Sequence, residues 1–184
     1  MKLEHQELFT VQSYDQKPVI DGVYFVPLRR SPDDGGGFTE LARITVDAEE
    51  PFILDEPLGY AAPLIRQINY SEIEPGVIRA FHVHLRQTDV WYVPSADRLL
   101  MVLYDARRDS PSTGRRMRFM LGAGQSRLVV IPPGVAHGAR NLAVVAGRII
   151  YFVDQFFSAK PGECDEGRYP WDFLGAEIWE SVRG

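Results

Sequence analysis

The sequence predicts an all-β fold, in the form of a closed barrel or jelly roll. Short apolar or alternating segments of strand length recur between turn signals along most of the chain. Hardly any stretch keeps the apolar repeat of a helix. The 16 glycines and 13 prolines among 184 residues are typical of a chain with many turns. Eight short strands in succession favour a barrel over an open sheet.

The expected strands follow one another at short intervals. In chain order they cover residues 22–27, 64–70, 77–84, 89–94, 98–105, 115–121, 126–131 and 148–153. Residues 31–37 read Ser-Pro-Asp-Asp-Gly-Gly-Gly and predict a flexible loop, while residues 110–114 and 132–134 predict a turn and a tight corner. The tail over 161–179 is expected to pack irregularly. Because neither a repeat nor a boundary divides the chain, we predict a single domain over residues 1–184.

Composition excludes several classes of protein. With 45% hydrophobic and 24% charged residues the chain is typical of a soluble globular protein. Its apolar runs are far shorter than the roughly 18 residues that indicate a membrane span. The net charge of -5, with both signs interspersed, gives no footprint for nucleic acid. A polar start, MKLEHQELF, and the single cysteine, Cys164, favour a cytoplasmic location.

Three histidines lie in two motifs. His82 and His84 share one face of the strand expected at 77–84, whereas Arg79 falls on the opposite face unless that strand carries a bulge. His137 follows the corner at 132–134. If the two stretches meet inside the barrel, they bring imidazoles together in one cavity.

A set of spaced motifs resembles the dTDP-4-dehydrorhamnose 3,5-epimerase family, whose members have the cupin jelly-roll barrel, a double-stranded β-helix with added N-terminal strands. The match runs in order along most of the chain. It comprises Asp33 to Glu40, the series Gln67, Asn69, Ser71, Gly76, Arg79 and His82, the turn at 105–114, the segment Ile131 to Gly138, and Pro170-Trp171-Asp172.

The resemblance implies an isomerase that acts on a 4-keto-6-deoxy sugar nucleotide without a cofactor. In this interpretation His82 is the base that removes a proton next to the ketone, and Tyr151 is the acid on the other face. Arg79 and His137 stabilise the developing charge. Further substrate contacts are implied for Phe38, Glu40, Gln67 and Asn69. The resemblance also implies a homodimer in which N-terminal strands pair across the interface.

Two departures from the family pattern open an alternative. Asp89 stands where the family has its enolate-stabilising lysine, and Met101 stands where it has an orienting aspartate. The spacings G-x5-H-x-H-x4-D, from Gly76 to Asp89, and P-x-G-x2-H-x3-N, from Pro132 to Asn141, are close to the metal motifs of cupins. A divalent ion such as Mn, Fe, Ni or Zn would then be held by His82, His84, Asp89 and His137. A third hypothesis is a non-catalytic module that binds sugar nucleotides.

Some conspicuous residues have simpler explanations. The aromatic residues Trp91, Tyr92, Phe156 and Phe157 are expected in the core or an interface. The arginine pairs at 107–108 and 115–116 are expected to flank a solvated turn. Cys164 is expected to be an incidental thiol.

Overall fold

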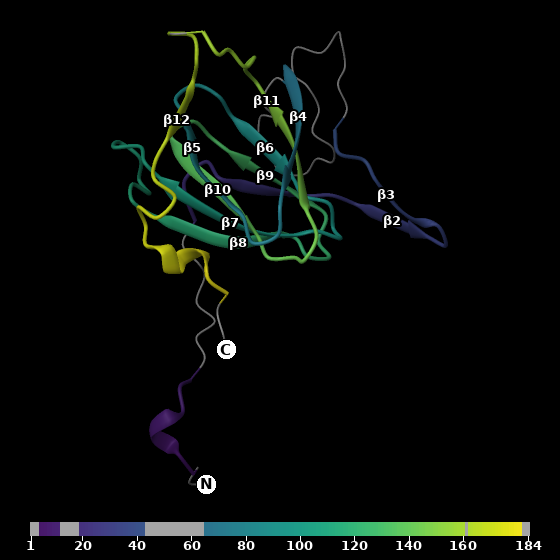
Figure 1. The fold of residues 1–184 in the computed structure, drawn as a ribbon, viewed down its shortest axis with the longest axis vertical. Coiled ribbons are helices and arrows are strands. Elements are labelled where there is room, and N and C mark those ends of the chain that lie inside the picture. The colour runs from purple at the N-terminus through teal and green to yellow at the C-terminus, as the bar shows by residue number, and fades with distance from the viewer. Residues whose placement is uncertain (1–3, 12–18, 43–64, 161, 182–184) are drawn as a thin grey trace.

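The computed structural model describes residues 4–11, 19–42, 65–160 and 162–181. Two five-stranded antiparallel sheets face each other and form the jelly-roll barrel (Figure 1). The first sheet has the order β1 (Tyr24–Pro27), β9 (Arg127–Ile131), β6 (Asp89–Tyr92), β11 (Gly147–Val153) and β4 (Gln67–Ile73). The second has the order β12 (Glu166–Arg168), β5 (Ile78–His84), β10 (Val135–Asn141), β7 (Arg98–Asp105) and β8 (Arg116–Gly122).

The main core lies between the two sheets, and alternation along β7 shows how it forms. Leu99, Met101 and Leu103 point into this core, while Leu100 and Val102 belong to a second apolar cluster on the opposite face of the same sheet. The C-terminal tail covers that face with Leu174 and with Trp179, which is fully buried. Met101, where the family pattern has an aspartate, is therefore a core residue.

All eight expected strands are present, each within a few residues of its expected bounds, so the all-β jelly-roll prediction is confirmed. The prediction of one domain over the full chain stays a prediction. Short 3-10 helices, η1 (Gln6–Leu8) and η2 (Ala176–Trp179), are the helical elements of the described residues. Neither is long enough to cross a membrane.

Four strands were not among the eight expected ones. The loop predicted at 31–37 is wrong, since these residues lie in a hairpin of β2 (Arg30–Asp33) and β3 (Gly36–Thr39). Asp33 accepts a hydrogen bond from the Gly35 backbone and closes the hairpin turn. No strand was assigned to residues 135–141, which form β10 directly after the predicted corner, and β12 interrupts the tail predicted to be irregular.

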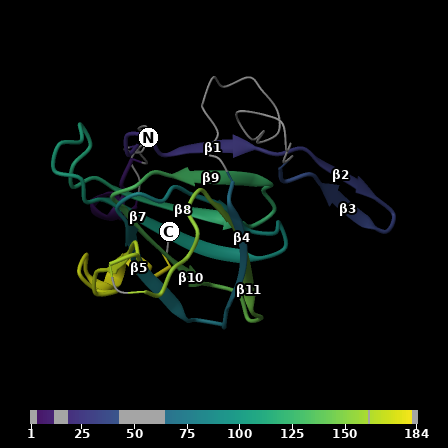
Figure 2. The same cartoon turned by 90° about the horizontal axis from the view of Figure 1, so that it is seen from above.

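The hairpin of β2 and β3 projects away from the barrel in both views (Figures 1 and 2). It carries Phe38, which is 68% exposed. Within the residues that the structure describes, β1 and β4 are the two edge strands of the first sheet. The N-terminal strands thus extend one edge of the molecule beyond the barrel body.

Candidate active site

A cavity of about 370 Å³ opens between the two sheets and gathers most of the predicted site residues. Its walls come from β4, β6 and β11 on one side and from β5, β10 and β12 on the other. The predicted residues that line it are Gln67, Asn69, Arg79, His82, His84, Asp89, His137 and Tyr151. Phe38 and Glu40 are not among the lining residues of the described chain, so their substrate role stays a prediction.

A bulge in β5 brings Arg79 and His82 to the same cavity. His137 on β10 pairs with His82, and Ala139 pairs with Arg79, so two steps along β10 correspond to three along β5. The extra residue reverses the alternation that would separate these two side chains. The strand therefore has the bulge that the sequence analysis required for Arg79 and His82 to share one face.

His82 is held by a carboxylate from the C-terminal tail. Its Nδ1 lies 2.9 Å from Oε1 of Glu166, and both side chains are 25% exposed. Arg168 donates two hydrogen bonds to the same oxygen, at 3.0 and 2.7 Å. Burial of Glu166 would raise the pKa of its carboxyl, but Arg168 and His82 lower it, so Glu166 is an anion that accepts a hydrogen bond from Nδ1–H. This leaves Nε2 of His82 as the nitrogen with a free lone pair.

The pKa of His82 is lowered from its ordinary value of 6.5. Burial is the largest cause, and the charge of His137 adds to it, while Glu166 opposes both. The imidazole is consequently neutral, and competent as a base, at physiological pH.

Tyr151 approaches from the opposite sheet. It lies on β11 next to Trp91 of β6, and burial followed by the charges of Asp89 and Glu166 raises the pKa of its hydroxyl. The phenol therefore keeps its proton. A neutral imidazole and a protonated phenol thus line one cavity from two facing walls.

Beside them, His137 and Asp89 form a buried pair that joins the two sheets. Nε2 of His137 lies 2.9 Å from Oδ2 of Asp89, with 2% and 3% of the side chains exposed. Nδ1 of His137 faces the carbonyl oxygen of Val135 at 3.0 Å, and Trp91 packs edge-on against the imidazole. His84 adds its Nε2 at 3.6 Å from the same Asp89 oxygen.

Two glycines position His137: Gly134 in the Pro-Pro-Gly corner before β10, and Gly138 within the strand. Gly134 has a φ of +77°, and a Cβ there would lie 2.4 Å from the side chain of Arg107. Its amide donates a 2.7 Å hydrogen bond to the carbonyl of His84, which ties the corner to the end of β5. Gly138 lets β10 pass close to Ala80, because a Cβ there would lie 2.3 Å from that methyl.

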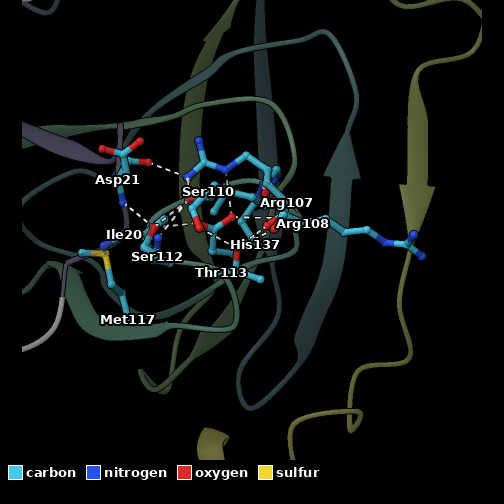
Figure 3. A network of polar contacts seen from close by, with 11 residues as sticks. Ile20, Asp21, Arg107, Arg108, Ser110, Ser112, Thr113, Met117 and His137 are labelled. Carbon is cyan, nitrogen blue, oxygen red and sulfur yellow. Dashed lines mark hydrogen bonds and ion pairs between the residues drawn. The ribbon is translucent and has the colours of Figure 1, made fainter.

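The turn at 105–114 is organised by a polar network around one buried carboxylate, although Arg108, Asp109 and Thr113 are exposed (Figure 3). Arg107 donates through Nε and a terminal nitrogen to the carboxylate of Asp105, which is fully buried. Ser110 and Ser112 also donate to Asp105, and Arg107 reaches the backbone carbonyl of Asp21. The expectation for the pair at 107–108 was therefore wrong for Arg107, whose role is structural.

Two aromatic residues occupy the mouth of the cavity. Phe156 and Phe157 are 68% and 66% exposed and belong to the cavity lining, so they do not lie in the core, and the alternative of an interface stays a prediction. The side chain of Gln67 accepts a 3.0 Å hydrogen bond from the amide of Phe157 and anchors this segment.

The residue that the sequence reasoning missed is Glu166. The tail was read as irregular, so no strand was available to carry a carboxylate into the cavity. The sequence did contain one signal for it: in Glu-Gly-Arg at 166–168 the two charged residues are two positions apart, which places both on the same face of a strand.

Together, the jelly-roll barrel and the cavity between its sheets, lined by His82 and Tyr151, define a cupin-type protein. Residues 17–167 match the family described as dTDP-4-dehydrorhamnose 3,5-epimerase. The chain belongs to this family.

Individual relatives agree with that assignment. The chain is 38% identical over 154 residues to the spore coat polysaccharide biosynthesis protein SpsL of Bacillus subtilis, which covers 84% of this chain and 91% of SpsL. It is 28% identical to the probable low-salt glycan biosynthesis epimerase Agl13 of Haloferax volcanii, over 84% of this chain and 90% of Agl13. Among solved structures, the dTDP-4-dehydrorhamnose 3,5-epimerase of Bacillus anthracis, with TDP and pyrophosphate bound, superposes with a TM-score of 0.69 at 28% identity, covering 88% of this chain and 87% of that one.

Proposed function

We propose that this protein epimerises a 4-keto-6-deoxy sugar nucleotide, with dTDP as its nucleotide, at a carbon next to the ketone. The observation that carries the proposal is the placement of His82 and Tyr151 on facing sheets around one cavity. Inversion requires that a proton leave one face of a carbon and return to the other, and two opposed walls supply that geometry. The family and its dTDP-binding relative support the substrate class.

The reaction follows from the protonation states of the two groups. Nε2 of His82 takes the proton from the carbon next to the ketone, and Nδ1–H continues to donate to Glu166. The electron pair of the broken C–H bond moves toward the carbonyl and forms an enolate. Tyr151 then delivers its hydroxyl proton to the opposite face of the carbon, and solvent restores both groups.

Arg79 is the cation that we assign to the charge developing on the substrate. It is the one arginine among the described residues that line the cavity, and no lysine is among them. Asp165 in the wall is already bound by Arg86, and Glu166 by Arg168. Arg79 is thus the wall cation available for the substrate, and we assign it to the developing oxyanion or to a phosphate.

The test is incubation with dTDP-4-keto-6-deoxyglucose in deuterated water. We expect deuterium at C3, at C5 or at both, detected by NMR, and none with His82→Asn. Absence of exchange under saturating wild-type protein would remove the proposal. In that event a thermal shift with the nucleotide would indicate a binding module instead, since ligand at ~100 times Kd stabilises by about 2.7 kcal/mol.

We propose in addition that the protein is a homodimer formed through its N-terminal strands. The hairpin of β2 and β3 stands off the barrel with Phe38 exposed, and β4 presents Ile68 and Tyr70 at 52% and 58% exposure. Open sheet edges and unburied aromatic side chains favour pairing with a second copy. Light scattering after gel filtration should give twice the 20.8 kDa chain mass, and a monomer would contradict this.

We also propose a cytoplasmic location. The single cysteine is exposed and free, which suits a reducing compartment. Cell fractionation with an antibody against the protein should find it with cytoplasmic markers, and recovery outside the cytoplasm would contradict the proposal.

A further inference from the structure

His84, Asp89 and His137 converge from three different strands onto one point of the cavity wall. Nitrogen or oxygen atoms of the three side chains all lie within 4.8 Å of one another. Asp89 and His137 are almost fully buried, and His84 is 12% exposed. These residues come from β6, β10 and β5, so both sheets contribute.

The hydrogen bonding of His137 requires a positive species between it and Asp89. Nδ1 faces the carbonyl oxygen of Val135, which only accepts, so Nδ1 carries a proton. In a neutral imidazole Nε2 then presents a lone pair to Oδ2 of Asp89 at 2.9 Å. Two lone pairs at that distance repel each other. Either a proton or a metal ion must lie between them.

The position of His84 favours the metal ion over the proton. Its Nε2 is 3.6 Å from the same carboxylate oxygen, which is too long for a hydrogen bond. Two ligands of one ion, each about 2.1 Å from it, are separated by roughly 3.0–3.5 Å. Moreover, Nδ1 of His84 is buried without a hydrogen-bond partner, so hydrogen bonding does not account for the placement of this ring.

Outer contacts orient two of the three groups as they do around bound metals. The side-chain amide of Gln87 donates a 2.7 Å hydrogen bond to Oδ1 of Asp89, which leaves Oδ2 directed at the histidines. Val135 fixes the ring of His137 in the same way. Partners of this kind hold metal ligands in position and set the tautomer of a ligating histidine.

We propose that His84, Asp89 and His137 bind one divalent first-row transition metal ion, of the Zn, Co, Ni, Fe or Mn type. Two imidazole nitrogens and one carboxylate oxygen are the donor set that such ions accept. The set is smaller than the four ligands expected from the sequence, because His82 lies outside the cluster: its ring centroid is 6.2 Å from that of His137, against 5.6 Å for His84. Bound there, the ion would polarise an oxygen in the cavity, at the place where the family has a lysine.

The experiment uses untagged, chelator-treated protein that is dialysed against Zn²⁺ or Co²⁺ and then passed through gel filtration. Elemental analysis should give one ion per chain, and Co²⁺ should produce a visible absorption band. Asp89→Asn and His84→Gln should each weaken Co²⁺ binding by about 100-fold or more, because each removes a ligand. Glu166→Gln, a cavity carboxylate outside the cluster, should keep the ion and serves as the matched control.

The inference fails if the wild type holds no ion at submillimolar Co²⁺ or Zn²⁺, in which case a proton joins His137 and Asp89. It also fails if Asp89→Asn and His84→Gln, shown folded by thermal unfolding, bind as tightly as the wild type. The readout is stoichiometry, so this outcome is separate from that of the proposed epimerisation. Deuterium exchange by metal-free protein would leave the proposed function intact.

Discussion

Nδ1 of His82 lies 2.9 Å from Oε1 of Glu166, although 84 residues separate the two in the sequence. Strand pairing creates this contact. Glu166 is opposite His84 and Arg168 is opposite His82, so Glu166 is the diagonal neighbour of His82 on the same sheet face. The carboxylate fixes which nitrogen carries the proton and thereby leaves Nε2 with the lone pair that the proposed base requires.

Glu166→Gln should lower kcat by about 10-fold to 100-fold, because the amide still accepts from Nδ1 but no longer stabilises the imidazolium. Glu166 raises the pKa of His82, while burial, His137 and Arg168 lower it. Removing the carboxylate charge therefore lowers that pKa. The acid limb of kcat/KM, measured from pH 4 to 9, should move to lower pH. An unmoved limb would assign Glu166 a purely structural role.

Tyr151→Phe should separate proton exchange from inversion. His82 can still remove a proton and return a deuteron to the same face, whereas the opposite face has lost its acid. We expect epimerisation to fall by about 100-fold or more while deuterium still enters the substrate. NMR of the product distinguishes the two events. Equal losses of both would indicate that Tyr151 serves binding and not protonation.

The strands of this fold were predictable because each carries a local signal. Residues 98–105 contain a long apolar run, and the observed strand has the same bounds. The elements that were missed have weak local signals. Residues 31–37 are rich in Pro, Asp and Gly, yet they pair with a neighbouring segment, and β12 has three polar or glycine residues that pair only because β5 lies beside them.

The site was predictable to the extent that a motif contained it. His82 and His137 lie in motifs, and the structure pairs them on neighbouring strands. The partnership of His82 with Glu166 depends on a long-range contact and a diagonal register, which no local pattern encodes. For the same reason the division of the four proposed metal ligands into a three-residue cluster and a separate His82 required coordinates.

Phe157→Ala should raise KM for the nucleotide substrate by about tenfold, which corresponds to about 1.4 kcal/mol of stacking on the base. Phe157 is exposed at the cavity mouth, so kcat and the melting temperature should change little. Phe9→Ala, at an aromatic residue that is 60% exposed elsewhere, is the matched control. For a substrate analogue that lacks the nucleobase, KM should be the same in the wild type and in both variants. An unchanged KM would show that the nucleobase of the substrate does not contact Phe157.

Asp105→Asn should destabilise the protein by about 3 kcal/mol, because it leaves Arg107 facing an uncharged partner in a largely buried network. Burial would raise the pKa of Asp105, but the hydrogen bonds from Arg107, Ser110 and Ser112 hold it well below its ordinary value of 3.8. The folded state therefore binds this proton less readily than the unfolded state. The stabilisation is complete above pH 3.8 and declines as the pH falls toward the folded pKa.

Urea unfolding of the wild type and of Asp105→Asn should consequently show a smaller difference in free energy at pH 3 than at pH 7. Asp109→Asn, an exposed change in the same turn, should be close to neutral at both values. A difference independent of pH would mean that the shape of the side chain, and not its charge, holds the turn. The charge matters here because Arg107 packs against the Gly134 corner, so that the ion pair fixes the turn from which β10 carries His137 into the cavity.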